Sequence, residues 1–361
     1  LASLPEHLRC ALFCFGMGSS NDKYEPLYKI RNIINDIRRV NSKIKIVLSC
    51  RSVDWYDNED MQVINRDDIT PVVFHIQPLS SKERINLTKL HLGKTSIAFL
   101  EKIGSYLILD NPQILTMFLE SFKDARKNSF PKTKKEIYEK FIETSREKNK
   151  KRLKSSSVLS VDEIYKYAGY LAYYNIFAGM NQIDEENILE IADESKGFPQ
   201  SKLKETLNTN LFRKESSSTF IHRTIAEFLC AKFLLEMGTL STKRLISLCQ
   251  VPQRNKIASE YRGVFAWLCC FTESDELFEV DPYGQYVYGD NSLFSISNKK
   301  KVLHGIRTFA KESPYFLFIG RNYGPNTFYE SKLDDFLIIK ITQMTAERLY
   351  LRITEGNVKI C

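Results

Sequence analysis

A short apolar stretch that runs into an arginine places the tightest constraint on how this chain folds. Residues 43–55 begin with a β-branched and aliphatic run, Ile44 to Leu48, and then become small and polar. That pattern is typical of a buried strand. The strand would end just before Arg51, so the guanidinium would lie at the carboxyl edge of a sheet, where open parallel sheets bind ligands.

The sequence on both sides of this strand predicts an α/β unit. Arg9–Phe15 is a second apolar run, and Tyr24–Val40 carries aliphatic residues at helical spacing. Strand, helix and strand in this order make a βαβ unit. Pro71–Leu79 predicts a third strand, and Ser80 is a suitable cap for the helix that follows.

The rest of the chain has the apolar spacing of helices. Such spacing extends from Ser80 to Lys123 and returns beyond Leu240. Between them we expect an aromatic-rich helix that packs in a core, two shorter helices and a small strand, over Val161–Phe177, Asp184–Ser195, Ser201–Leu211 and Phe220–His222. Asp281–Gly284 and Tyr288–Asp290 resemble the loops between helices of a repeat region, and a Gly-Asp turn is also ordinary loop chemistry. The predicted fold class is α/β followed by all-α.

The residues around Arg51 also carry a resemblance to a known family. A strand ending in Ser49-Cys50-Arg51, then Asp54-Trp55, then a short strand ending in Gln-Pro-Leu-Ser, resembles the later half of the nucleotide-binding domain of NACHT-type STAND NTPases, chiefly bacterial ones. The resemblance implies that Arg51 reads the terminal phosphate of a nucleotide, which a guanidinium can meet with two hydrogen bonds. The alternative is an ion pair with Asp54 or Asp57.

Two further motifs are similar to the same family. Asn111-Pro112 is similar to the start of a helix in the small helical domain, where the proline packs against adenine. Their alternative role is an N-cap followed by proline at the first helical position. Residues 220–231, Phe-Ile-His-Arg-Thr-Ile-Ala-Glu-Phe-Leu-Cys-Ala, are similar to the winged-helix motif, which implies that His222 touches the diphosphate in the resting state. The alternative is a histidine packed at a helix start.

Two parts of a complete nucleotide site are absent from the sequence. Where the family has the acidic residues that hold magnesium and activate water, this chain has Gly16–Asp22 with no aspartate directly after the strand. No G-x-x-x-x-G-K-[ST] phosphate cradle occurs either. We therefore assign no catalytic residue, expect no ATP hydrolysis by this chain alone and expect ATP or ADP with magnesium only in a complete protein. Because the chain begins with Leu1, we interpret it as a piece of a longer product.

The resemblance implies four domains and a switching function. They are the later half of a nucleotide-binding domain with a partial P-loop NTPase sheet (1–79), a small helical domain (80–128), a winged-helix-like domain (129–240) and helical repeats (241–361). In such a switch ADP holds the domains together and exchange for ATP releases them. The family context implies bacterial antiphage defence, self-association through the NTPase module and a protein ligand at the repeats. The alternative is a non-enzymatic module that only binds a partner.

The positive charge of the chain is concentrated in one segment. Residues 123–154 hold 13 Lys or Arg and 5 Asp or Glu, so this segment carries the whole net charge of +8. Lys148–Lys154 could neutralise nucleic-acid phosphates, with strongly salt-dependent binding. However, Lys and Glu alternate at helical spacing and aromatic residues interleave poorly with the cations, so the pattern favours pairs along a helix over nucleic-acid binding.

Cysteine usage and hydropathy bound the cellular setting. The eight cysteines sit mostly in apolar runs without metal-ligand spacing, which predicts reduced, packed thiols and no metal site. No apolar run approaches the roughly 20 residues of a membrane span. We expect a soluble, cytoplasmic protein that does not bind membranes.

Overall fold

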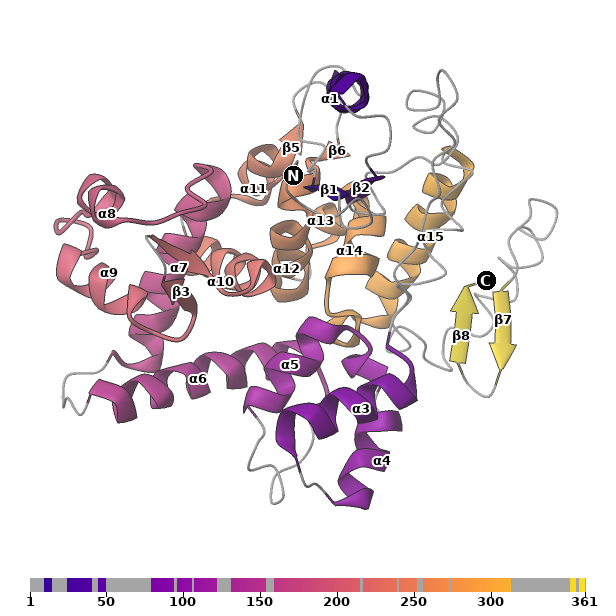
Figure 1. The fold of residues 1–361 in the computed structure, drawn as a ribbon, viewed down its shortest axis with the longest axis horizontal. Coiled ribbons are helices and arrows are strands. Elements are labelled where there is room, and N and C mark those ends of the chain that lie inside the picture. The colour runs from indigo at the N-terminus through magenta and orange to yellow at the C-terminus, as the bar shows by residue number, and fades with distance from the viewer. Residues whose placement is uncertain are drawn as a thin grey trace.

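The computed structural model describes residues 10–14, 25–40, 45–49, 79–93, 96–105, 107–121, 131–153, 159–214, 217–238, 240–251, 256–272, 274–312, 351–354 and 357–360. Among them helices predominate (Figure 1). The all-α part of the predicted fold class is confirmed.

The first described elements are β1 (Cys10–Cys14), α1 (Glu25–Val40) and β2 (Lys45–Ser49). The two strands pair in parallel, with Cys10 opposite Lys45 and Cys14 opposite Ser49. A helix between two parallel strands is the predicted strand–helix–strand unit. Arg51 and residues 71–78 of the predicted third strand lie outside the described residues.

Four helical segments follow, as the apolar spacing from Ser80 predicts: α3 (Ser81–Leu92), α4 (Ile97–Ser105), the 3₁₀ turn η3 (Leu107–Leu109) and α5 (Pro112–Ser121). Ser80 caps α3 in a capping box with Glu83. Arg84 is buried and donates through Nε to the Ile103 carbonyl at 3.3 Å, which ties α3 to the end of α4.

The helix α6 (Lys134–Leu153) connects this helical unit to the remainder of the structure. Figure 1 shows it extending from beside α5 toward the start of α7, and α5 and α6 pack together. Tyr138 of α6 is buried, with ring centroids 5.5 Å from Phe228 and 5.2 Å from Trp267. The first turns of α6 are therefore anchored in the main core.

The central unit contains α7 (Val161–Phe177), α8 (Glu185–Ile191), α9 (Gln200–Leu207), β3 (Phe212–Lys214), β4 (Ser218–Phe220) and α10 (Arg223–Glu236). The strands form an antiparallel hairpin. α7 lies against α10 so closely that a Cβ on Gly169 would come 2.8 Å from the Cβ of Phe233. Tyr170 of α7 stacks on Phe198 with ring centroids 3.9 Å apart, which confirms that the aromatic helix packs in the core.

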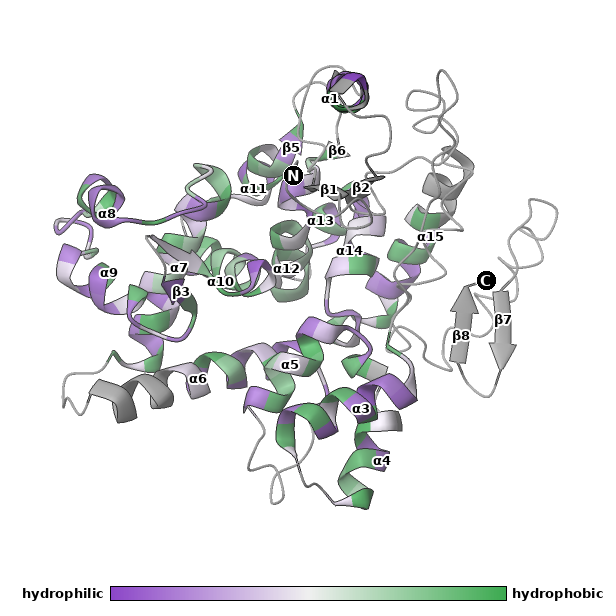
Figure 2. Ribbon diagram, viewed as in Figure 1, coloured by the Kyte–Doolittle hydropathy of each residue, from purple (hydrophilic) through white to green (hydrophobic). Residues whose placement is uncertain are grey.

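The next elements continue the helical pattern beyond Leu240: α11 (Thr242–Cys249), β5 (Gln250–Val251), β6 (Lys256–Ile257), η4 (Ser259–Tyr261), α12 (Arg262–Thr272), α13 (Asp275–Val280), α14 (Pro282–Tyr288), η5 (Asn291–Leu293) and α15 (Ile296–Glu312). Figure 2 shows α12 as mostly hydrophobic, which agrees with the burial of Trp267 and its neighbours. Buried side chains from Ile103 to Ile306 form one hydrophobic core.

Two parts of the C-terminal prediction are wrong. Asp281–Gly284 was expected to be a loop, yet helix α14 begins at Pro282, because the Asp281 carboxylate accepts the Gly284 N–H at 3.1 Å and proline suits the first helical position. The described end of the chain is also not helical: β7 (Leu351–Thr354) and β8 (Asn357–Ile360) form an antiparallel hairpin. In the part of the chain that the structure describes, no helix has the length and apolar character that crossing a bilayer requires.

Candidate functional site

His222 lies at the junction between the β3–β4 hairpin and α10. It is the N-cap residue of α10, and its backbone carbonyl accepts the N–H groups of Ile225 and Ala226 at 3.1 and 3.3 Å. The preceding Ile221 N–H donates to the Leu211 carbonyl at 3.0 Å, which fixes the chain where the hairpin meets the helix. The imidazole makes no capping hydrogen bond to α10. The backbone of His222 therefore fixes its position, and the ring does not take part in capping.

Side chains from three other elements influence the His222 imidazole. The Phe141 ring of α6 lies with its centroid 6.0 Å from the imidazole centroid. Burial lowers the pKa of His222, the Glu120 carboxylate opposes that shift, and the Arg213 guanidinium adds to it. The half-buried imidazole therefore has a carboxylate and a guanidinium within electrostatic range.

Asn111 and Pro112 begin α5 and are both exposed. The Asn111 side-chain oxygen accepts the N–H groups of Gln113 and Ile114 at 2.8 and 3.2 Å. This capping confirms the structural role that the sequence offered for the pair. A contact of Pro112 with a nucleotide base stays a prediction, and the exposed proline ring is accessible for it.

The less buried side of α5 leads from Pro112 to Glu120, which acts on His222. Pro112, Thr116 and Glu120 follow one another at four-residue intervals along that side, and the Thr116 hydroxyl donates to the Pro112 carbonyl at 2.9 Å. The opposite side holds five buried residues: Ile114, Leu115, Met117, Phe118 and Leu119. At 1.5 Å per residue, Pro112 and Glu120 are separated by about 12 Å along the helix axis. Pro112 thus lies at one end of α5, and the His222 environment lies at the other.

The structure does not test the predicted contact of Arg51 with a phosphate. It adds two residues, Glu120 and Arg213, that the sequence did not indicate. The resemblance also implies that Arg51 and His222 face one nucleotide site from two domains; Arg51 lies outside the described residues, so this expectation is not tested. Glu120 and Arg213 act on His222 from other elements, α5 and β3. No local pattern marked either residue, since their relevance depends on how α5, the hairpin and α10 pack.

Another residue of the 220–231 motif forms a structural joint. The buried Glu227 carboxylate accepts from Arg223 Nε at 3.0 Å, and Arg223 also donates to the Glu260 carbonyl at 2.7 Å. A Cβ on Gly263 would come 2.1 Å from Glu227 Oε2, so a larger residue where α12 starts would force the Glu227 carboxylate to move. This part of the motif therefore holds α10 against α12.

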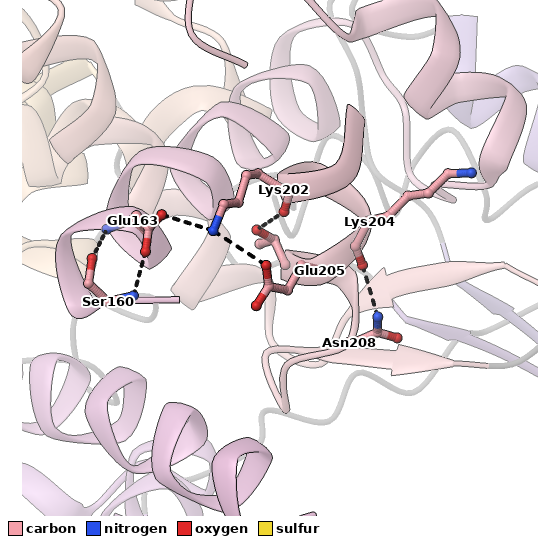
Figure 3. Close-up of polar contacts among 7 residues, drawn as sticks. Ser160, Glu163, Lys202, Lys204, Glu205 and Asn208 are labelled. Atoms are coloured by element: carbon pink, nitrogen blue, oxygen red, sulfur yellow. Dashed lines mark hydrogen bonds and ion pairs between the residues drawn. The ribbon is translucent and has the colours of Figure 1, made fainter. Parts of the chain in front are cut away.

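Cations on α6 and α9 are largely engaged with carboxylates. Lys140 pairs with Glu143 at 3.0 Å, in line with the predicted pairing along the basic segment. Figure 3 shows Lys202 of α9 between Glu163 and Glu205, at 3.1 and 3.6 Å. The side chains of residues 148–154 lie outside those described. Nucleic-acid binding through residues 148–154 therefore stays an untested alternative.

The described residues contain no group of three or more His, Cys, Asp or Glu side chains arranged to hold a metal ion. Four cysteines are buried free thiols, as predicted: Cys230, Cys249, Cys269 and Cys270. Burial raises the pKa of each thiol, so these cysteines resist ionisation.

No protein-family model matches the chain, and no curated protein matches it.

Proposed function

We propose that this chain is the later part of a nucleotide-controlled switch of the NACHT-type STAND class, acting in bacterial antiphage defence. In this proposal ADP holds the α/β, small helical and winged-helix-like domains together, and exchange for ATP releases them to self-associate. The observation that supports it is the arrangement along α5, which has the exposed Pro112 at one end and the environment of the half-buried His222 at the other.

The chemistry of the His222 environment suits the phosphate end of a nucleotide. The imidazole can donate a hydrogen bond to a phosphate oxygen in its neutral or its charged form. Burial lowers the pKa of His222, which favours the neutral donor, and Glu120 only partly opposes that shift. Arg213 supplies a cation within electrostatic range of the ring. The separation of about 12 Å along α5 leaves room for a base at Pro112 and phosphates at His222.

The remaining parts of the proposal follow from the resemblance. Arg51 would contact the terminal phosphate from the α/β domain, and magnesium with a P-loop would come from outside this chain. The chain itself would bind nucleotide weakly and would not hydrolyse it. The helices beyond Leu240 would receive a protein ligand, and the whole would act in the cytoplasm.

Histidine-selective NMR tests the proposal on the intact chain. The protein is labelled with ¹³C in its five histidines, and the ring signals are followed during titration with ADP and, separately, with adenosine. We expect millimolar ADP to move the His222 signal and adenosine to leave it in place, because only ADP carries phosphates. The Glu120→Gln variant should bind ADP several-fold more tightly, since it removes a like charge close to the diphosphate.

The matched control is Glu101→Gln, which removes an exposed carboxylate from α4 and should leave ADP affinity unchanged. The proposal fails if ADP leaves the His222 signal in place, or if Glu101→Gln and Glu120→Gln alter the affinity equally.

A non-enzymatic interaction module is the second candidate. It is favoured by Leu90 and Ile97, which are 83% and 74% exposed at adjoining ends of α3 and α4. An apolar surface that is contiguous over neighbouring helices can bind a protein partner. If the His222 signal did not respond to ADP in the titration, the interaction module would be the favoured function.

A further inference from the structure

The loop that follows α14 contacts the first turn of α6, 155 residues earlier in the chain. The backbone N–H of Lys135 donates to Asp290 Oδ2 at 2.8 Å, and Lys134 Nζ donates to the Gly289 carbonyl at 3.0 Å. The first N–H groups of a helix have no partner within the helix, and a carboxylate there also interacts favourably with the helix dipole. A residue of the C-terminal helices thus caps α6.

The loop holds this carboxylate in a fixed position. Asp290 is only 2% exposed, and its own N–H donates to Cys270 Sγ of α12 at 3.2 Å. A Cβ on Gly289 would lie 2.5 Å from the Gln285 carbonyl oxygen, so the backbone passes too close for any larger residue. The position of α12 and α14 therefore determines where the start of α6 is held.

α6 extends from this contact to the candidate site. Tyr138, one turn along, is wedged between Phe228 and Trp267, and Phe141, roughly 9 Å along the axis from Lys135, packs against His222. A shift of the α6 N-terminus would move Phe141 relative to the imidazole.

The same contact also reaches the other end of α5. Lys134 acts electrostatically on the Asp110 carboxylate, which directly precedes Asn111 and Pro112. Burial raises the pKa of Asp110, and Lys134 opposes that shift. Lys134 thus interacts both with the Gly289 carbonyl and with Asp110, which precedes Asn111 and Pro112.

We propose that the contact of Lys134 and Lys135 with Gly289 and Asp290 is a latch that transmits the position of the C-terminal helices, through α6, to the His222 site. With the latch closed, Phe141 covers the imidazole and the site is held in its resting shape. A ligand that displaces the loop after α14 opens the latch, since water can replace Asp290 on the helix N–H groups. The inference rests on the proposed function only for the identity of what His222 binds.

Two adjacent lysines provide a matched pair of variants. Lys134→Met removes the ammonium group that reaches Gly289, whereas Lys135→Met removes one that lies 4.0 Å from Glu139 along α6. Both changes keep length and remove one charge. Asp290→Ala removes the cap itself. Each intact chain is studied without nucleotide by histidine-selective NMR and by hydrogen exchange of residues 131–141.

We expect Lys134→Met and Asp290→Ala to shift the His222 signal and to raise amide exchange at 131–141 at least several-fold, with α7 unchanged. Lys135→Met should behave as wild type. The latch is refuted if Lys134→Met leaves both readouts unchanged, or if Lys135→Met changes them equally. Should Asp290→Ala unfold the protein, Lys134→Met still decides the question, because it retains the buried carboxylate. Since no nucleotide is present, failure of the nucleotide proposal would not alter the result.

Discussion

Gly263 provides a sharp test of how α10 and α12 are joined. A Cβ at this position would lie 2.1 Å from Glu227 Oε2 and 2.3 Å from its Cδ, far inside van der Waals contact. Glu227 has little room to retreat, because its side chain is 7% exposed and is paired with Arg223 at 3.0 Å. Gly263→Ala should therefore force the carboxylate and α12 apart.

The magnitude follows from opposing effects. Alanine gains at most about 1 kcal/mol over glycine in a helix. Overpacking costs about 1–3 kcal/mol, and a buried carboxylate that loses its partner costs about 3–5 kcal/mol. The Arg223 side chain is 42% exposed, so water can compensate part of the second cost. We expect a net destabilisation of about 2 kcal/mol.

Urea unfolding followed by tryptophan fluorescence measures this change. The chain has two tryptophans, and Trp55→Phe leaves Trp267, which is buried on α12 one turn beyond Gly263. With an m-value near 2 kcal/mol/M, the midpoint should fall by about 1 M. Adding Glu227→Asp, which withdraws the carboxylate by one methylene, should make the double variant more stable than the sum of the single changes predicts. A Gly263→Ala protein as stable as its parent would refute the close contact.

Further predictions concern chemistry and local stability. The chain should show no ATPase activity above background, and magnesium-dependent turnover that Arg51→Ala abolishes would contradict the missing cradle and acidic residues. Asn111→Ala should lower the free energy of unfolding by about 1 kcal/mol through loss of the α5 cap, measured by urea unfolding; no change would argue against the capping geometry. Because burial lowers the pKa of folded His222 below its ordinary 6.5, the unfolded chain binds more protons, so stability should fall as the pH drops below 6.5. His222→Gln should flatten that dependence in unfolding curves, and an unaltered profile would contradict it. Burial raises the pKa of Cys249 to about 12, so its thiol should react with iodoacetamide only after denaturation, as peptide mass spectrometry can show.

Local patterns predict a helix best where apolar spacing and a side-chain cap occur together, as in α3, α7 and α8. The predicted range Val161–Phe177 agrees with α7 at both ends. At its N-terminus Ser160 and Glu163 form a capping box. α14 was missed, since Asp-Pro begins helices as readily as it begins turns. Whether Asp281-Pro282 begins a helix or a turn depends on a distant residue. A Cβ on Gly305 of α15 would lie 2.0 Å from Pro282 Cγ, so the glycine at 305 leaves the space that α14 occupies.

The candidate site was predictable only in its local parts. The cap formed by Asn111 follows from its place before proline, and His222 was marked by its motif. The residues that set the environment of His222, Glu120 and Arg213, come from α5 and β3. The cap that Asp290 provides for α6 spans 155 residues, and no sequence period reports such a contact.

A crystal structure of the chain soaked with ADP would test the central claim most directly. The account predicts the diphosphate within about 3 Å of both the Arg51 guanidinium and the His222 imidazole, with the base against Pro112. Arg51 and His222 pointing to opposite faces, or ADP bound away from α5, would contradict the nucleotide-switch assignment.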